Sequence, residues 1–316
     1  MFAGLRIIDS HAHFPVPDVS IEESMGYQTV PRRTPRPKPQ APFAGHAREQ
    51  WAKAWGFAPN EKTTATDEEL AQRWVAELER YGIDKIVWVT GGGNDRLAKI
   101  VHMAPERFVG YAHHDPCTPG AAEELERAIV KLGLRGYKIL APRLSKPITD
   151  RSLYPVWEVC AAYNIPVLIH FGILGAAGGI AYNENINPAI FEPVAKDFAD
   201  VNFIIPHFGC GHPRELLFLG WVCENIYVDT SGSNQWMRWM PYEYTVQKAF
   251  EQFYRTFGPY RILFGTDSSG FPRGFAMDYL KEQNRAVRFN GVSDEEAQLI
   301  FAGNMERLLN AVEVDR

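Results

Sequence analysis

The chain has 316 residues, 46% of them hydrophobic, and carries a formal net charge of −5. This length suits a single large globular domain, and the mild acidity argues against nucleic acid as the main partner, because phosphate binding needs a concentrated basic face. The sequence contains no run of about 18 apolar residues, the length that spans a membrane. Its first residues do not show the basic and then apolar pattern of a signal peptide. Cys117, Cys160, Cys210 and Cys223 are too widely spaced for a disulfide framework or a thiolate zinc site, so we expect a cytoplasmic protein.

The first predicted element is a strand that ends in a His-x-His motif. Residues 7–13 read Ile-Ile-Asp-Ser-His-Ala-His. Because side chains repeat every two residues along a strand, we expect His11 and His13 to point the same way. Two adjacent imidazoles can share one metal ion, whereas the alternative is a pair of surface histidines just past a strand.

A long irregular stretch follows, from Phe14 to about Thr66. Its many prolines forbid a long helix or a central strand, and a connection of this length in a compact domain is usually functional or disordered. Its aromatic part suggests a lid, and a solvated loop or a subunit contact is the alternative. The arginines and aromatic residues on which these interpretations depend are Arg32, Arg33, Arg36, Trp51, Trp55 and Phe57.

From Asp67 onward, helical patterns alternate with short apolar runs of strand length. Asp67 can cap the first helix, and Gly82 can end it. Further strands are predicted at 85–90, 107–112, 134–140, 166–170, 202–207, 226–230 and 261–267. Helices are predicted between them at 95–104, 119–132, 153–163, 188–199, 214–221 and 244–257, and after them at 279–289, 294–302 and 304–312.

This alternation predicts an α/β fold. Strands that are apolar along their whole length are typical of a parallel sheet buried on both faces. Eight such units in about 300 residues indicate a (β/α)₈ TIM barrel, formed by one domain over 1–316 with an insertion at about 14–66 and extra C-terminal helices. A doubly wound open sheet is the alternative, but no G-x-G-x-x-G follows the first strand.

Residues capable of metal chemistry recur near the ends of these strands. In a barrel the carboxyl ends of all strands surround one mouth, so these residues should converge there. Each has a simpler explanation by itself, such as a core histidine or a turn cap, but together they predict a metal site. Imidazole with one carboxylate favours zinc, with iron, manganese or cobalt as alternatives. The residues are His11, His13, Lys138, His170, His207 and Asp267.

The motifs around these residues resemble the amidohydrolase superfamily, in the branch that also contains the aminocarboxymuconate semialdehyde decarboxylase-like enzymes. The matching segments are Ile8-Asp9-Ser10-His11-Ala12-His13, Gly136-Tyr137-Lys138, Leu168-Ile169-His170, Ile205-Pro206-His207-Phe208-Gly209, Phe264-Gly265-Thr266-Asp267 and Gly303-Asn304-Met305-Glu306-Arg307-Leu308-Leu309. The resemblance implies a metal-dependent barrel enzyme. It also implies that the metal ligands are His11, His13, His170 and Asp267.

Two further residues determine how many metal ions the resemblance implies. In binuclear members a strand-4 lysine, here Lys138, carries a carbamate that bridges two ions, whereas decarboxylase-like members often use a single ion. His207 is correspondingly either an acid/base that positions water and substrate or a ligand of the second ion. One ion and two ions both stay open.

The expected reaction is hydrolysis, with metal-activated water attacking the carbonyl of an ester, thioester, lactone or amide. Asp267 would take the proton of the water. The alternative is non-oxidative decarboxylation of an aromatic or unsaturated acid, with His207 helping to protonate carbon. The substrate is a small, anionic molecule, for which Arg238 and Arg273 are candidate binding residues; a surface salt bridge is the alternative for each. We also expect a homo-oligomer, most simply a dimer.

Overall fold

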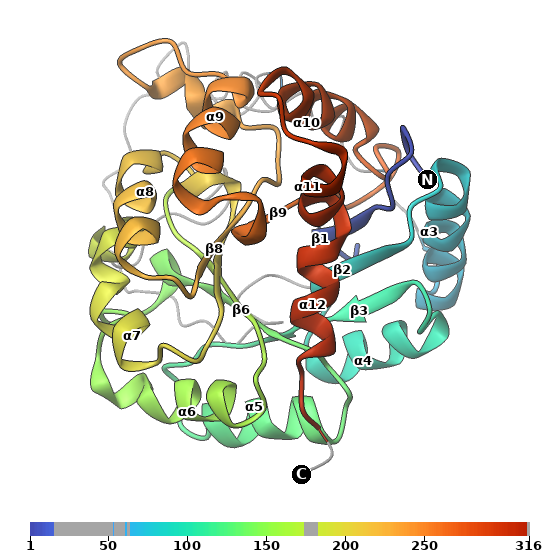
Figure 1. Ribbon diagram of the computed structural model, residues 1–316. Helices are drawn as coiled ribbons and strands as arrows, with labels where there is room; N and C mark the ends of the chain where they lie inside the picture. The colour runs from blue at the N-terminus through green and yellow to red at the C-terminus, as the bar shows by residue number, and fades with distance from the viewer. Residues whose placement is uncertain (16–52, 54–60, 62–63, 174–182, 315–316) are drawn as a thin grey trace, which may run out of the picture.

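Helices surround a central set of parallel strands (Figure 1). The computed structural model describes residues 1–15, 53, 61, 64–173 and 183–314. The insertion predicted as a lid or contact, with all six of its arginines and aromatic residues named above, lies outside the described residues apart from its ends. The strands are β1 (Ile8–His13), β2 (Lys85–Thr90), β3 (Phe108–Gly110), β4 (Ala112–His113), β5 (Tyr137–Leu140), β6 (Val167–His170), β7 (Phe203–Ile205), β8 (Ile226–Asp229) and β9 (Ile262–Leu263).

The strands form a three-stranded sheet, β1-β2-β3, and a six-stranded sheet, β4 to β9 in order. The two sheets are one barrel, because β3 and β4 are a single extended segment that changes its pairing at Tyr111. The Tyr111 amide donates to the carbonyl of Trp88 at 3.0 Å, and the Ala112 amide donates to that of Gly136 at 2.8 Å. The predicted third strand therefore links both sheets.

The barrel closes between β1 and the segment around β9. The Ser10 amide donates to the carbonyl of Phe264 at 3.0 Å, and the Asp267 amide donates to that of His11 at 2.8 Å. Ala12 and Ser268 add a parallel bridge. The (β/α)₈ barrel predicted from the sequence is thus confirmed. Its last strand is shorter than the predicted 261–267 because the Phe264 amide bonds instead to the carbonyl of Ile300.

The helices that cover the barrel follow the predicted order, with small differences at their ends. Thr66, not Asp67, is the N-cap of the first one, in a capping box with Glu69. The predicted 188–199 helix is a 3₁₀ turn, Pro188–Phe191, followed by α7. The helices are α3 (Asp67–Tyr81), α4 (Asn94–Met103), α5 (Ala121–Val130), α6 (Tyr154–Ala162), α7 (Glu192–Asp197), α8 (Pro213–Val222), α9 (Val246–Phe257) and α10 (Met277–Phe289).

The C-terminal helices differ from the sequence prediction by joining into one rod. α11 (Asp294–Gln298) continues through a π-helical turn (Leu299–Gly303) into α12 (Asn304–Asn310). Gly303, expected to separate two helices, has helical φ and ψ of −59° and −38°. Ala302, Met305 and Leu308 from this rod join the apolar cluster inside the barrel. The rod therefore packs against the barrel interior, at the end opposite the mouth.

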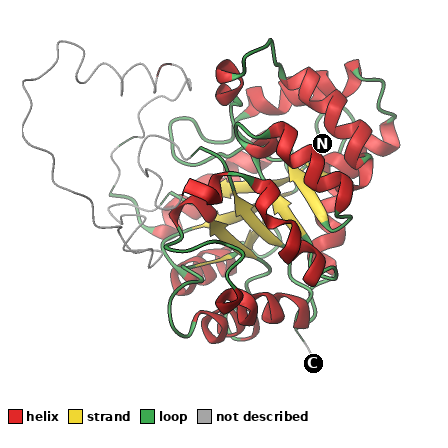
Figure 2. Cartoon of the chain, turned by 90° about the vertical axis from the view of Figure 1, so that its left-hand side faces the viewer, coloured by secondary structure: helices red, strands yellow, loops and turns green. Residues whose placement is uncertain are grey.

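Two apolar layers of side chains hold the barrel and its helices together. Figure 2 shows the strands enclosed by the helices. The inner layer fills the barrel with side chains such as Val87, Leu168, Ile204 and Leu263. The larger outer layer lies between strands and helices. Such double burial explains why the strands are apolar on both faces. No helix in the described part of the chain is long and apolar enough to cross a membrane.

Candidate active site

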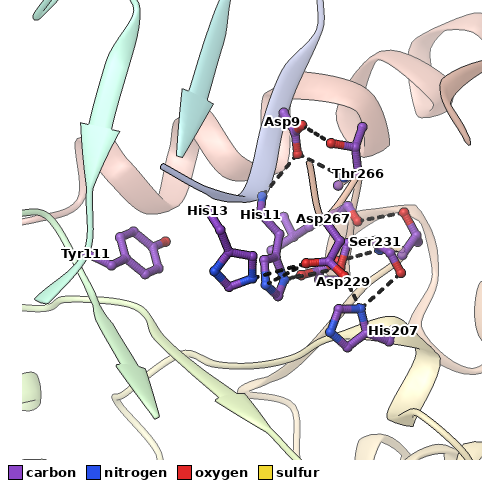
Figure 3. A network of polar contacts seen from close by, with 12 residues as sticks. Asp9, His11, His13, Tyr111, His207, Asp229, Ser231, Thr266 and Asp267 are labelled. Carbon is purple, nitrogen blue, oxygen red and sulfur yellow. Dashed lines mark hydrogen bonds and ion pairs between the residues drawn. The ribbon is translucent and has the colours of Figure 1, made fainter. Parts of the chain in front are cut away.

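The predicted metal-site residues meet at the carboxyl end of the barrel. His11 and His13 lie at the end of β1, and His170 is the last residue of β6. His207 follows β7 in a 3₁₀ turn (His207–Gly209), and Asp267 follows β9. His11 is fully buried, whereas the side chain of Asp267 is 30% exposed. Figure 3 shows His11 and His13, both from β1, converging with Asp267 and His207.

Three of these side chains form a group with metal-binding geometry. One ligand atom each from His11, His13 and Asp267 lies within 4.8 Å of the others. The Asp267 Oδ1 atom is 3.1 Å from His13 Nε2 and 3.9 Å from His11 Nε2. His11 Nε2 is buried and has no hydrogen-bond partner among the described residues. A buried nitrogen lone pair without a partner is costly, and a divalent cation at this point would satisfy it.

A carboxylate on the far side of His11 sets its tautomer. Asp229 Oδ2, at the end of β8, lies 2.6 Å from His11 Nδ1. Burial raises the pKa of Asp229, and the nearby His207 and the hydrogen bonds from Ser231 oppose the shift. Toward the ionised carboxylate, which only accepts, His11 Nδ1 carries the proton and Nε2 keeps its lone pair for a cation. His13 is oriented in a similar way by Thr90, whose hydroxyl is 2.7 Å from His13 Nδ1. The sequence analysis did not single out either supporting residue.

The electrostatics of the group suit a metal site. Burial lowers the pKa of His11 and of His170 well below the usual value, so both imidazoles are neutral and able to act as ligands. Burial acts to raise the pKa of Asp267, but the hydrogen bond from His13 and the electrostatic effect of the nearby His207 and His13 hold that pKa well below its usual range. The carboxylate is therefore ionised.

His170 and His207 stand beside the three-residue group. The His207 ring is centred 5.0 Å from that of His11 and 5.1 Å from that of His170. His170 Nε2 lies 3.1 Å from the carbonyl of Ile173, so in this arrangement it carries the proton and donates. The structure thus places His170 at the mouth but does not bring it into the three-residue group.

Lys138 lies on β5 with only 1% of its surface exposed. Its neighbours in sequence, Tyr137 and Ile139, belong to the outer apolar layer, so Lys138 faces the barrel interior. Burial lowers its pKa to about 8, although Asp229 and Asp267 oppose the shift. A buried amine of lowered pKa is the form that reacts with carbon dioxide, which is the chemistry expected of a carbamate bridge.

The two arginines predicted to bind substrate differ in their surroundings. Arg238 is exposed and donates to the side chain of Gln235 at 2.6 Å, within the 3₁₀ turn Gln235–Trp239. Arg273 is half-buried and donates to the carbonyl of Asp267 at 2.7 Å and to the hydroxyl of Ser269 at 3.1 Å. These bonds make Arg273 a support for the loop that carries Asp267.

Asp9 is a further residue whose role only the structure reveals. It is fully buried and accepts hydrogen bonds from the amides of His11 and Thr266, at 3.1 and 3.0 Å, and from the Thr266 hydroxyl. It therefore ties the strand that carries His11 and His13 to the segment that carries Asp267. Burial raises the pKa of Asp9 to about 7, with the hydrogen bonds from Thr266 and His11 acting against the shift.

The backbone at the site is also unusual. His207, Phe208, Cys210 and Asp267 have positive φ angles of 58°, 50°, 44° and 57°. Residues other than glycine adopt this left-handed region at a cost in free energy, and such residues cluster at functional sites where the surrounding structure holds them in place. The strain thus falls on the segments that carry His207 and Asp267.

Comparison with known proteins decides the family. The family model described as Amidohydrolase matches residues 8–311, from the first strand to the end of the C-terminal helices. The chain belongs to the amidohydrolase family. The resemblance inferred from the motifs is thereby confirmed, and with it the expectation of a metal-dependent enzyme class.

Within this family, the relatives have different reactions. A 2-keto-4-carboxy-3-hexenedioate hydratase from Sphingobium is 24% identical, and the match covers 96% of each chain. A 2-amino-3-carboxymuconate-6-semialdehyde decarboxylase from Dictyostelium discoideum is 37% identical over 78 residues, 24% of this chain and 22% of the relative. The solved TIM-barrel protein Bb4693 from Bordetella bronchiseptica is similar in fold, with a TM-score of 0.66 and 23% identity over 97% and 99% of the two chains.

Proposed function

We propose that this amidohydrolase is a metal-dependent hydrolase. It would use water to cleave an ester, thioester, lactone or amide of a small organic anion. The observation that carries the proposal is the group of His11, His13 and Asp267, in which the buried His11 Nε2 has no partner among the described residues. Imidazole and carboxylate ligands without cysteine, placed at the open mouth of a barrel, are typical of a catalytic rather than a structural metal site.

In this proposal His11, His13, His170 and Asp267 hold the ion. Zinc suits this donor set best, and iron, manganese and cobalt share the preference for imidazole with carboxylate. When bound, such an ion polarises a carbonyl group and lowers the pKa of water toward neutrality. His170 would have to turn from the Ile173 carbonyl, a bond of 3.1 Å, to offer Nε2 to the ion.

The proton transfers belong to Asp267 and His207. The ionised Asp267 carboxylate would accept the proton of the attacking water and pass it to the leaving group. The His207 ring is centred 5.0 Å from the His11 ring. His207 would hold the substrate and orient the water. An anionic substrate is compatible with the cationic groups of the mouth, Lys138 and Arg273, although Arg273 already supports the Asp267 loop.

Replacing Lys138 with alanine should separate the one-ion and two-ion cases. If a carbamate on Lys138 bridges two ions, the variant loses one equivalent of metal and most of its activity. If the site holds one ion, the variant keeps its metal. Metal analysis of the purified protein provides the measurement, together with ¹³C NMR after growth in ¹³C-bicarbonate. Lys131→Ala, at an exposed position, is the matched control.

Decarboxylation is the second candidate function, favoured by the local match to the decarboxylase from Dictyostelium discoideum. In that reaction a carbon–carbon bond breaks, carbon dioxide leaves, and the remaining carbanion needs a proton. His207 would deliver this proton. The same scaffold can support either reaction, because the metal ligands are common to both.

Isotope labelling distinguishes the candidates. The zinc-loaded enzyme is incubated with a panel of esters, lactones, amides and carboxylated aromatic acids in H₂¹⁸O and, separately, in D₂O. Hydrolysis places ¹⁸O in the acid product, whereas decarboxylation releases carbon dioxide and places deuterium on carbon. Full activity of the protein after chelation and dialysis would overturn the metal-dependent proposal.

A further inference from the structure

One serine hydroxyl lies between the two central histidines of the site. Ser231 Oγ is 3.1 Å from His11 Nδ1 and 2.9 Å from His207 Nδ1 (Figure 3). Ser231 is fully buried and lies two residues after the end of β8. The same side chain is therefore in hydrogen-bond contact with a metal-group residue and with the proposed acid/base.

The acceptors around the two rings determine where their protons lie. The carbonyl oxygen of Ser231 is 3.1 Å from His207 Nδ1, and a carbonyl only accepts. His207 Nδ1 must then carry the proton, as His11 Nδ1 does toward Asp229. In the uncharged form of each ring the Nε2 lone pair is then left over, and each Nδ1–H is shared between its carboxylate or carbonyl acceptor and the Ser231 hydroxyl. In His207 the free Nε2 is the atom a base or a proton carrier needs.

Ser231 is itself held rigidly. Its amide donates to Asp229 Oδ1 at 2.5 Å, and the buried side chain of Gln283 donates to the carbonyl of the preceding Thr230 at 3.0 Å. A Cβ atom on Gly265 would come within 2.8 Å of the Ser231 Cβ, so the segment that follows β9 packs closely against Ser231. The hydroxyl is thus fixed in place before any substrate arrives.

We propose that Ser231 is a positioning residue that fixes the His207 ring with its Nε2 lone pair free and links that ring to the metal ligand His11. The inference rests on the proposed function, because it takes His11 as a ligand and His207 as the group that acts on the substrate. Hydrogen-bond partners of metal-site histidines commonly change metal affinity or activity 10–100-fold. Ser231 differs from an ordinary partner in serving two rings with one oxygen.

The first test needs no variant and no substrate. Long-range ¹⁵N–¹H NMR of the metal-free wild-type protein reports which ring nitrogen of His207 carries the proton, with a His207→Gln spectrum to assign the signal. We expect a single tautomer protonated at Nδ1. A His207 protonated at Nε2, or a mixture of both tautomers, would overturn the inference.

The second test is Ser231→Ala, with Ser293→Ala as the matched control. The Ser293 hydroxyl also takes part in a hydrogen bond, far from the site: as the N-cap of α11 it accepts from the backbone amide of Glu296. We expect Ser231→Ala to weaken zinc binding about tenfold in competition with a chromophoric chelator, and to lower kcat 10–100-fold with little change in KM. The control should alter only thermal stability.

The outcomes separate this inference from the proposed function. Wild-type zinc affinity in folded Ser231→Ala protein contradicts the positioning role, whatever the reaction is. If Ser231→Ala does not fold, the tautomer measured in the wild type decides. If the tautomer and the zinc affinity behave as expected but no hydrolysis or decarboxylation is found, the proposed function fails and the role of Ser231 stands.

Discussion

His11→Ala should lose its bound metal and at least about a thousandfold in kcat, which corresponds to the several kcal/mol that a catalytic metal contributes. His11 is the most buried member of the three-residue group, and its Nε2 has no other partner among the described residues. Alanine removes that lone pair entirely. Metal analysis after dialysis and steady-state kinetics on any substrate found by the labelling panel provide the measurement.

The control for this variant addresses folding. His11→Ala also leaves the buried Asp229 carboxylate without its 2.6 Å contact, which costs about 1–3 kcal/mol in stability. Its melting temperature should therefore fall while its circular dichroism stays that of the wild type. His102→Ala, on the exposed side of α4, should change neither metal content nor kcat. A folded His11→Ala protein with near-normal kcat would remove His11 from the site.

The order of the barrel elements could be predicted because each strand is an apolar run between clear helical patterns. The details that were predicted wrongly depend on the way residues far apart in the sequence pack together. The last strand ends early because the Phe264 amide bonds to Ile300 in the C-terminal rod. Separate helices were predicted on either side of Gly303, but Gly303 is the last residue of the π-helical turn through which the helix continues. Neither feature can be recognised from the local sequence.

The candidate site, too, could be predicted from the sequence only in part. His11, His13 and Asp267 could be brought together from sequence, because the barrel places all strand ends at one mouth. The direction in which a histidine ring points could not be predicted, since His170 faces the nearby Ile173 carbonyl rather than the three-residue group. The supporting residues were missed for a related reason.

Asp229 stands 218 positions from His11 along the chain, and a short polar residue at a strand end usually indicates a turn. The rule that identified Asp267, a carboxylate at the carboxyl end of a barrel strand, applies equally to Asp229. Applied to every strand, that rule would have found it. Ser231 has no comparable signal, because its importance comes from its distances to two rings.

Asp267→Asn should lower kcat at least about a thousandfold without unfolding the protein. Position 267 has a φ of 57°, a conformation that asparagine adopts as readily as aspartate. The amide therefore fits the backbone and keeps the volume of the side chain. What it removes is the charge, and with it both the strongest acceptor in the group and the proposed acceptor of a proton from water.

The residues around Asp267 stabilise the negative charge of its carboxylate. The hydrogen bond from His13 and the neighbouring histidines keep the pKa of Asp267 well below its usual range in spite of burial. An uncharged amide cannot replace this ligand, because a divalent cation prefers an anionic oxygen. Zinc affinity should fall together with kcat, and a zinc-saturated Asp267→Asn enzyme should stay slow because no carboxylate accepts the proton.

Asp278→Asn is the matched control, since its side chain is 92% exposed at the start of α10. It should retain wild-type zinc affinity and kcat. The decisive comparison is kcat at saturating zinc. Recovery of near-normal kcat in Asp267→Asn under that condition would show that Asp267 serves only to hold the metal, and His207 would then be the remaining candidate for the proton transfer.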